Sequence, residues 1–305
     1  AIPQRITVSP SVEAFGFQTA LKEKTGNYLA GNGFNEIFTN SITNSAYFDD
    51  EILQTSVKMI NSLSADLNIM RPSMLETGLE CIVHNLNRKN NHLHLFEFGK
   101  TYKSPGAGRY EEKEKLCLYM TGMIREASWK EKESKADFFY AKGVTESILQ
   151  ISGLDSWQFE TTDSRELEYG LNVSVGKTAI ATLGLVKNAI TKRFDIKQQV
   201  WYIIFDWEKL HTLAAAQKQG YTEIPRFPAV QRDLAIVLDK QVAFETVEQT
   251  VRKAAIQRLE SVKLFDVFES DKLGAGKKSL AVSFTFLDRE KTLTDTEIDA
   301  MMQHI

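Results

Sequence analysis

The chain has 305 residues, 43% of them hydrophobic and 25% charged, which is enough for two domains of ordinary size, each with its own core. No apolar run approaches the roughly 18 residues that cross a membrane, and the first residues, Ala-Ile-Pro-Gln-Arg, lack the apolar stretch of a signal peptide. A net charge of −3 gives the whole chain no electrostatic reason to bind nucleic acid, so any RNA site has to be local.

The two cysteines and the two chain ends carry further information. Cys81 and Cys117 lie far apart in apolar surroundings, which fits small core residues in a reducing cytoplasm and offers no zinc spacing. The chain begins at Ala1 without an initiator methionine and stops at Ile305 inside a predicted helix. These features predict a cytoplasmic protein and indicate a fragment cut short at both ends.

The first 100 residues alternate helical and extended patterns. Apolar residues recur at helical spacing over 12–32, Gly33 is placed to end that helix, and 34–41 alternates like a strand. Pro72 fits the first turn of the next helix. The apolar face of that helix would carry Leu75, Leu79, Ile82, Val83 and Leu86.

Strands dominate the next 110 residues. Residues 93–99 and 116–124 are predicted strands, joined by a charged hairpin loop over 104–115. A helix is expected over 140–152, with further strands over 172–175, 178–186 and 200–205. This alternation predicts an α+β domain with an antiparallel sheet over residues 1–211, followed by a connector over 212–221.

Residues 222–305 form a compact second pattern. Strands are expected over 233–238, 262–268 and 279–286, with a helix over 244–256 after the first strand. Thr294 and Glu297 form a capping box that opens a last helix. The order β-α-β-β-α is a ferredoxin-like unit that lacks its closing strand.

Two segments look like phosphate-binding loops but fail the spacing that such loops require. Gly176-Lys177-Thr178 needs a glycine at position 171, where leucine stands, and a strand rather than a helix follows it. The segment Gly274 to Ser279 fails in the same way. Both are therefore interpreted as hairpin turns.

The sequence offers no catalytic constellation. Of the five histidines only His92 and His94 lie close together, and no cysteine or second ligand pair accompanies them. No Gly-x-Ser-x-Gly motif occurs, and neither cysteine has a plausible histidine partner. We therefore predict no catalytic residue, no metal site and no cofactor on this chain.

Short motifs in fixed order nevertheless resemble one family over nearly the whole chain. In the first domain they are Gly33-Phe34-Asn35-Glu36-Ile37, Met70-Arg71-Pro72-Ser73-Met74-Leu75, Asn85-Leu86-Asn87-Arg88, Leu95-Phe96-Glu97-Phe98-Gly99-Lys100, Asp137-Phe138-Phe139 and Lys142-Gly143. In the second they are Phe227-Pro228-Ala229, Arg232-Asp233-Leu234, Leu264-Phe265-Asp266-Val267-Phe268, Lys278-Ser279-Leu280 and Arg289-Glu290-Lys291-Thr292-Leu293. The ordered set resembles the catalytic-like module and the ferredoxin-fold anticodon-binding domain of the bacterial phenylalanyl-tRNA synthetase β subunit.

The resemblance implies a class II synthetase fold that has lost its active site. Working class II enzymes hold ATP with one arginine after the Phe-Glu strand and another at the end of a glycine-rich strand. Here the first strand continues Thr101-Tyr102-Lys103, and residues 200–210 contain neither glycine nor arginine. Loss of both guanidinium groups removes the charge stabilisation that adenylate formation requires. ATP and Mg²⁺ belong to the parent enzyme, and the family's magnesium ligands and editing domain lie upstream of Ala1.

The resemblance also implies partners. The parent enzyme would join phenylalanine to tRNA(Phe) in an α2β2 assembly, with the chemistry on the α subunit. The helix over 12–32 and the strand after it would pack on that subunit, although an ordinary core helix is an equal alternative for any one residue.

For the last domain the resemblance implies contact with the anticodon. Phe268 would stack on a base, Asp266 would accept from a base edge, and Ser279 would hydrogen-bond nearby. Further candidates, for phosphate contacts, are Arg232, Lys277 and Lys278. The family more often has tyrosine at the position of Phe268. The phenylalanine can still stack on a base, but it has no hydroxyl group to make a hydrogen bond.

Phe268 could instead be a core residue. Simple alternation puts Val262, Leu264, Asp266 and Phe268 on one face, and Asp266 makes that face more plausibly wet. Residues 221–305 hold 12 basic and 14 acidic residues, so affinity for RNA should be weak unless several contacts act together. Two rivals remain open: a self-sufficient synthetase fragment, and an interaction scaffold that no longer binds RNA.

Overall fold

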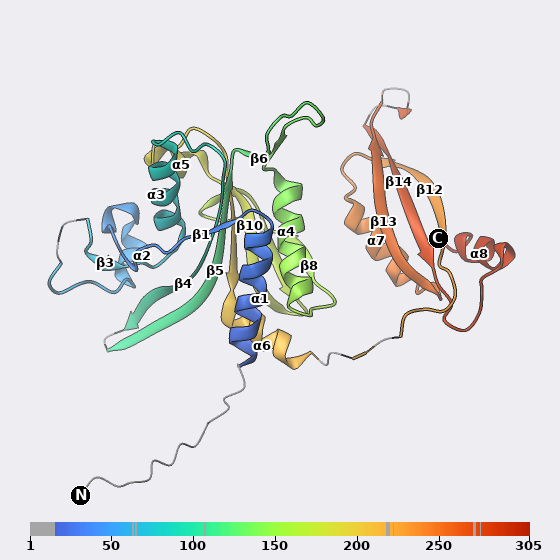
Figure 1. Ribbon diagram of the computed structural model, residues 1–305, viewed down its shortest axis with the longest axis horizontal. Helices are drawn as coiled ribbons and strands as arrows, with labels where there is room; N and C mark the ends of the chain where they lie inside the picture. Colours follow the sequence, from blue (N-terminus) through green and yellow to red (C-terminus); the bar gives the residue numbers. More distant parts are fainter. Residues whose placement is uncertain are drawn as a thin grey trace, which may run out of the picture. The chain divides into compact units, whose positions relative to one another are not determined.

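The computed structural model describes residues 16–305 except 63, 65, 107, 218, 219, 222, 271, 272 and 275. The chain divides into two compact units, residues 1–219 and 220–305, which are treated separately below. Figure 1 shows the elements of each unit.

Unit 1 is built on a seven-stranded sheet with the order β1-β4-β5-β11-β10-β9-β8. Its strands are β1 (Asn35–Glu36), β4 (Leu93–Gly106), β5 (Arg109–Thr121), β8 (Gln158–Thr161), β9 (Leu167–Val175), β10 (Thr178–Val186) and β11 (Val200–Asp206). All neighbours pair antiparallel except β1, which runs parallel to β4. The expected antiparallel sheet is therefore mixed at this one edge.

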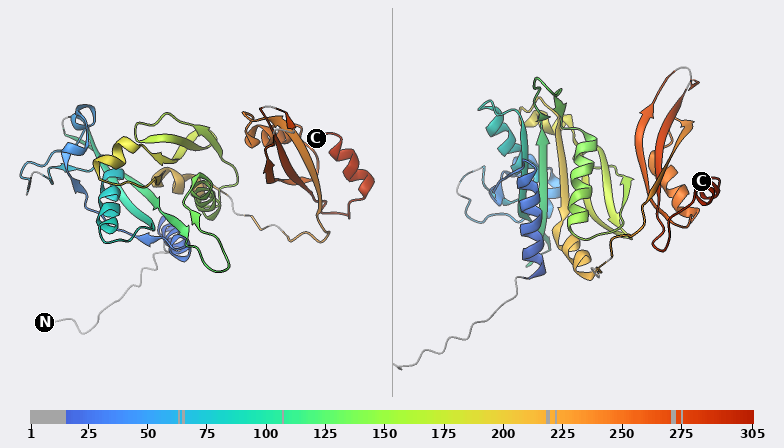
Figure 2. Two further views of the ribbon diagram at one scale, coloured as in Figure 1. Left: turned by 90° about the horizontal axis from the view of Figure 1, so that it is seen from above. Right: turned by 45° about the vertical axis from the view of Figure 1, so that its right-hand side comes forward.

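Helices cover both faces of the sheet (Figures 1 and 2). The helices α1 (Phe17–Gly31), α4 (Phe138–Ile151) and α6 (Trp207–Ala216) pack on one face, around residues such as Leu118, Ile203 and Phe205. The helices α3 (Leu75–Leu86) and α5 (Asn188–Arg193) pack on the other, around Tyr119 and Tyr202. Smaller elements are β2 (Ile42–Thr43), η1 (Ser45–Tyr47), α2 (Asp50–Gln54), β3 (Ile69–Met70), β6 (Met123–Arg125) and β7 (Ser134–Lys135).

Several expected boundaries needed correction. The first helix is observed from Phe17, since 12–15 lie outside the described residues, and Gly33 follows its end with a φ of +83°. The predicted strand 34–41 shortens to the two residues of β1, and the predicted hairpin loop 104–115 is mostly strand. The connector expected over 212–221 is helical up to Ala216, because Leu210 and Ala214 are buried and Asp206 caps the helix by accepting from the Lys209 amide.

A buried ion pair joins three segments of unit 1. An Nη of Arg71 lies 2.9 Å from an Oε of Glu97, and the two side chains are 2% and 1% exposed. Arg71 also donates to the Lys100 carbonyl and the Thr39 hydroxyl, at 2.8 and 2.7 Å. The Thr39 hydroxyl in turn donates to Glu97 at 2.6 Å. Gly99 permits this approach, because a Cβ there would stand 2.2 Å from the guanidinium.

Glu97→Gln should lower the free energy of unfolding by about 3–5 kcal/mol, because it leaves the Arg71 charge buried without its counter-ion. The exposed Lys100–Glu112 pair, at 3.0 Å on the same hairpin, provides the control, and Glu112→Gln should change stability by less than about 1 kcal/mol. Urea denaturation measures both. Equal changes in the free energy of unfolding for the two variants would show that the buried pair stabilises the fold no more than the exposed pair does.

Unit 2 has a three-stranded sheet in the order β12-β14-β13 with two helices on one face. Its elements are β12 (Val230–Asp239), α7 (Phe244–Lys253), β13 (Leu259–Phe268), β14 (Lys277–Phe286) and α8 (Asp295–Met302). The predicted capping box is present, with the Thr294 amide donating to Glu297 at 3.0 Å. The strand order is that of a ferredoxin-like unit whose fourth strand would pair with β12.

Glu76, in the first turn of α3, is a buried carboxyl group with one oxygen that has no hydrogen-bond partner. Burial, and secondarily the charge of Glu166, raise its pKa to about 7. A pKa raised on folding means that the folded state holds the proton more tightly, so stability falls as pH rises from about 4.5 to about 7.

Glu76→Gln should therefore remove this loss and stabilise the chain at pH 8, by at most about 3 kcal/mol. At pH 4.5 it should have little effect. Thermal unfolding at the two pH values measures the difference, with Glu36→Gln on the exposed strand β1 as the control. The same change in stability at both pH values would contradict the attribution of the pH dependence to the raised pKa of Glu76.

Candidate nucleic-acid interface

The central strand β14 separates a covered face of the unit 2 sheet from an open one. Its residues Leu280, Val282, Phe284 and Phe286 are at most 1% exposed and pack against Val251 of α7 and Ile298 of α8. The alternate residues, Ser279, Ala281, Ser283 and Thr285, are half-buried on the other face. This open face is available to a ligand that lies flat across the strands.

A β-bulge in β13 decides which of its residues reach the open face. Val262 and Leu264 pair with the buried Phe284 and Val282, but after the bulge Asp266 pairs with Ala281. The expectation that Val262, Leu264, Asp266 and Phe268 share one face is therefore wrong. The extra residue in the bulge shifts the alternation, so the two aliphatic residues face the helices and Asp266 faces away from them.

The bulge brings three of the expected site residues onto the open face. Phe268 pairs with Ser279, and Asp266 pairs with Ala281 in the next row. Phe268 is 55% exposed, which an aromatic core residue would not be. The arrangement gives an aromatic ring, a hydroxyl and a carboxylate on adjacent positions, with the small side chain of Ala281 at the fourth position of the two rows. A planar base could stack on the ring while its edge meets the carboxylate.

The expected phosphate contacts do not gather there. Arg232 pairs with the buried Phe284, so it is on the helix face, where its Nη lies 2.5 Å from Asp295 at the start of α8. Alternation from Leu280 puts Lys278 on that face as well, whereas Lys277 pairs with Asp239 on the open side. Of the three basic residues, only Lys277 shares a face with Phe268.

Sequence reasoning missed three neighbours of this site. Val237 stands in the same cross-strand row as Ser279 and Phe268, and it is 49% exposed. Phe265, at the bulge, is 54% exposed and follows the covered Leu264. Beside Phe268, Glu269 forms an ion pair with Lys240 at 2.8 Å. Alternation along β12 could have placed Val237 on a solvent-facing side of the sheet. Its position beside Ser279 and Phe268 could not be predicted without knowing how the strands pair.

In unit 1, the sheet face below α3 is packed as core. Tyr119 is fully buried, and its hydroxyl donates to the Met74 carbonyl at 2.6 Å. The ring fits against Gly78, where a Cβ would lie 2.1 Å from it. Tyr202 lies beside it, with 5.3 Å between ring centroids. These two aromatic rings leave this part of the sheet face packed as core.

A cleft of about 240 Å³ beside the start of α3 is lined by Thr101 and Lys103, from the segment that lacks the arginine of a working class II site. Its other basic residues are matched by acids, with Lys115 lying 2.8 Å from Asp206 and Lys113 3.7 Å from Glu111. The cleft therefore offers little excess positive charge for a triphosphate.

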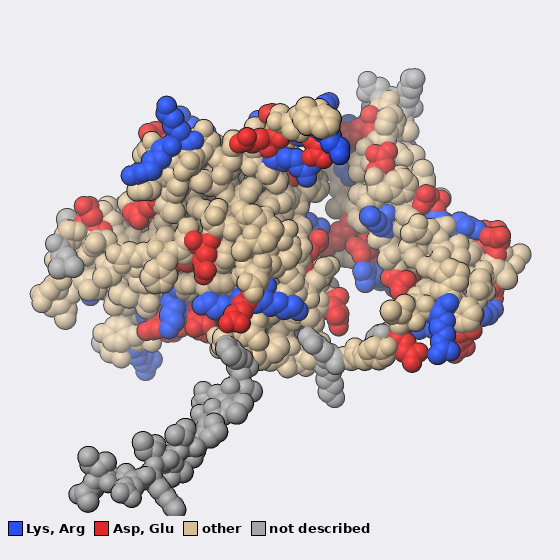
Figure 3. All heavy atoms as spheres, viewed as in Figure 1, with Lys and Arg blue, Asp and Glu red and all other residues tan. Residues whose placement is uncertain are grey.

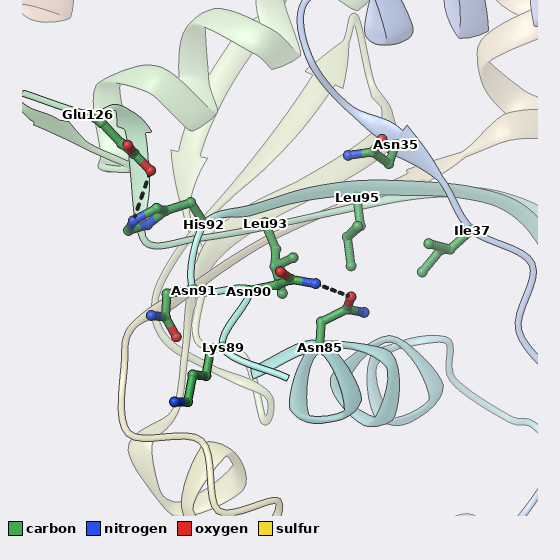
Figure 4. A pocket seen from close by; sticks show the side chains of 10 residues that line it. All are labelled: Asn35, Ile37, Asn85, Lys89, Asn90, Asn91, His92, Leu93, Leu95 and Glu126. Atoms are coloured by element: carbon green, nitrogen blue, oxygen red, sulfur yellow. Dashed lines mark hydrogen bonds and ion pairs between the residues drawn. The ribbon is translucent and has the colours of Figure 1, made fainter. Parts of the chain in front are cut away.

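A second pocket of unit 1, of about 560 Å³, lies between β1, the end of α3 and the start of β4. Figure 4 shows its asparagine-rich lining, in which Asn90 donates to Asn85. His92 accepts from the Met123 amide through Nδ1, which leaves Nε2 to carry the proton toward Glu126 at 3.6 Å. The lining can donate and accept hydrogen bonds but contains no nucleophile with an adjacent base.

Two further properties concern only the part of the chain that the structure describes. Within it, no group of three or more His, Cys, Asp or Glu side chains is arranged to hold a metal ion. No helix in the same described part is both long and apolar enough to cross a membrane.

Comparison with solved structures defines the class of fold. The chain is similar to the pyrrolysyl tRNA synthetase PylSc of Desulfitobacterium hafniense, with a TM-score of 0.50 and 18% identity, over 64% of this chain and 66% of that one. A crystal structure of pyrrolysyl-tRNA synthetase from the same organism gives the same score over 65% and 69%. Over about two thirds of its length, the chain therefore shares the fold of these synthetase structures.

Comparison with families defines the protein more closely. Residues 2–207 match the phenylalanyl tRNA synthetase beta chain CLM domain, and residues 225–305 match the ferredoxin-fold anticodon binding domain. The chain belongs to the phenylalanyl-tRNA synthetase beta chain family.

Curated relatives agree with this assignment. Phenylalanine--tRNA ligase beta subunits are 38% identical in Bacteroides fragilis, 37% in Porphyromonas gingivalis and 30% in Bacillus subtilis, over 93%, 95% and 92% of this chain. The chain covers only 36%, 37% and 35% of those proteins, so it spans little more than a third of their length.

Proposed function

We propose that this chain is the non-catalytic, tRNA-contacting portion of the β subunit of a cytoplasmic phenylalanine–tRNA ligase. It supports the ATP- and Mg²⁺-dependent attachment of phenylalanine to tRNA(Phe) by assembly with the catalytic α subunit and by recognition of the anticodon. The observation that carries the proposal is the placement of Phe268, Asp266 and Ser279 on one open sheet face of a domain matching the anticodon-binding family.

The catalytic step belongs elsewhere in this proposal. The face below α3 is filled by Tyr119 and Tyr202, and the cleft at Lys103 is nearly neutral in charge. Neither feature supplies the guanidinium groups that stabilise the charge developing on a phosphate during adenylate formation. ATP and magnesium are therefore assigned to the parent enzyme and not to residues of this chain.

Assembly with the α subunit, as an α2β2 complex, is proposed to use the β1 edge of the sheet. β1 is the end strand, and Phe38, two residues beyond it, is 95% exposed. An exposed sheet edge next to a large apolar side chain is a surface that a partner can cover. The neighbouring helix α1 has exposed residues along most of its length, with only Leu21, Thr25 and Leu29 buried.

Phe268→Ala should weaken binding of a tRNA(Phe) transcript about tenfold, since loss of one base–aromatic stack removes about 1–3 kcal/mol. Phe268→Tyr keeps the ring and should bind as well as the parent chain. Filter binding at low salt measures both variants. The matched control is Tyr221→Ala, an aromatic residue of unit 2 that is 90% exposed and lies outside the sheet.

Unchanged binding by Phe268→Ala would support the alternative function, an interaction scaffold derived from a synthetase that no longer reads RNA at this face. Equal weakening by Tyr221→Ala would show non-specific contact with exposed aromatic residues.

Immobilised chain should capture a class II synthetase catalytic subunit from cytoplasmic extract, at close to equal amounts by mass analysis. Phe38→Ala should reduce the capture, because it removes the largest exposed apolar side chain beside β1, while Ile60→Ala, 97% exposed away from β1, should not. Recovery of an unrelated partner, unaffected by Phe38→Ala, would contradict the proposed assembly role.

A further inference from the structure

The β6–β7 hairpin of unit 1 presents a tryptophan at its tip. β6 pairs with β7 through Met123 and Lys135, and the loop between the strands carries Trp129. The side chain of Trp129 is 97% exposed, whereas Trp201 and Trp207 in the same unit are 8% and 1% exposed. Exposure of the largest apolar side chain forgoes a burial energy that Trp201 and Trp207 gain.

The loop that holds Trp129 is braced by its own contacts. Arg125 lies 2.5 Å from Glu131 across the base of the loop. The Ser128 amide donates to the Glu131 carbonyl at 2.9 Å, and the Ser128 hydroxyl accepts from the amides of Lys130 and Glu131 at 3.3 and 3.1 Å. Trp129 is therefore held outward by an ordered turn, which reduces the entropy lost when a ligand binds it.

The charges around Trp129 are unequal once their pairs are taken into account. Glu131 is matched by Arg125, whereas Glu126 has the His92 ring 3.6 Å away and no lysine or arginine of the described chain within 4 Å. Among the described residues, Lys130, Lys132 and Lys135 form no ion pair within 4 Å, against two acids of the loop, Glu126 and Glu133, that no lysine or arginine matches. Figure 3 shows acidic and basic side chains together over this hairpin. The balance beside the tryptophan is therefore positive, in a chain whose net charge is −3.

We infer that the β6–β7 hairpin is a second RNA contact, in which Trp129 stacks on an unpaired base and Lys130 and Lys132 neutralise the adjoining phosphates. The inference rests on the proposed function, to which it adds a site in unit 1 separate from the anticodon face of unit 2. Unit 2 alone has 12 basic and 14 acidic residues, so a tRNA bound there gains affinity if another part of the chain holds the same molecule.

The lysines favour RNA over a protein ligand. Both kinds of interface use exposed tryptophans, but lysine is depleted in the cores of protein interfaces because its ammonium group is strongly hydrated. Single-stranded RNA needs the combination found here, an aromatic face for the base and cations on neighbouring residues for the backbone.

The test measures the binding of a tRNA(Phe) transcript to the 305-residue chain at low salt by filter binding and tryptophan fluorescence. Trp129→Ala should weaken binding about tenfold. Trp129→Phe keeps a stacking ring, so it should bind nearly as well but lose the fluorescence quenching that tRNA causes in the parent chain. Tyr110→Ala, which removes an aromatic residue of the same unit that is 70% exposed on β5, should leave RNA binding unchanged.

A second measurement concerns the lysines. The double variant Lys130→Gln, Lys132→Gln should lower the slope of log affinity against log salt by about 1.4, the value for two contacts to single-stranded phosphates. An unchanged slope would overturn the phosphate contacts.

The outcomes separate this inference from the function on which it rests. If Trp129→Ala binds normally while Phe268→Ala is weakened, the hairpin site is wrong and the anticodon face stands. If the parent chain does not bind tRNA at low salt, both are wrong. If Trp129→Ala binds RNA normally but no longer captures a protein from extract, the hairpin is a protein contact and the inference is overturned.

Discussion

The buried pair of Arg71 and Glu97 is the constraint on which the arrangement of unit 1 depends. It joins the segment before α3 to the centre of β4, and Thr39 connects the same cluster to the segment after β1. A buried charge is tolerated only where its partner is close and its hydrogen bonds are made, so these segments can meet in one arrangement. That arrangement positions α3 over the sheet face where Tyr119 and Tyr202 are packed. The interaction that joins these segments therefore also positions the helix that covers these two tyrosines.

Unit 2 depends on a smaller constraint, the bulge between Leu264 and Asp266. Without it, Asp266 and Phe268 would continue the alternation of Val262 and Leu264 and point into the helices. One extra residue turns the end of β13 so that the aliphatic side chains are covered and the carboxylate and ring are exposed. The proposed anticodon contact is thus a product of strand register, since the same residues in an unbroken strand would have to be core.

The proposed division of labour follows from where positive charge is free. Arg232 is engaged by Asp295, and the lysines of the cleft at the start of α3 are largely matched by acids. Free cations therefore accompany exposed aromatic rings at only a few places in the described chain, such as Lys277 on the open face and Lys130 and Lys132 beside Trp129. Weak contacts at these two places can act together on one large RNA. Either place alone would bind a small anion only weakly.

By itself the sequence determined the fold class, the synthetase family and most of the elements. The period of the apolar residues and the turn glycines are local signals, and β10 was predicted with its observed bounds, Thr178–Val186. The capping box at Thr294 was equally local. The tertiary structure decided what depends on pairing: the parallel edge strand β1, the helical start of the expected connector, and the faces of Asp266 and Arg232. These depend on register and on contacts between distant segments, which one extra residue in a strand can reverse without altering local preference.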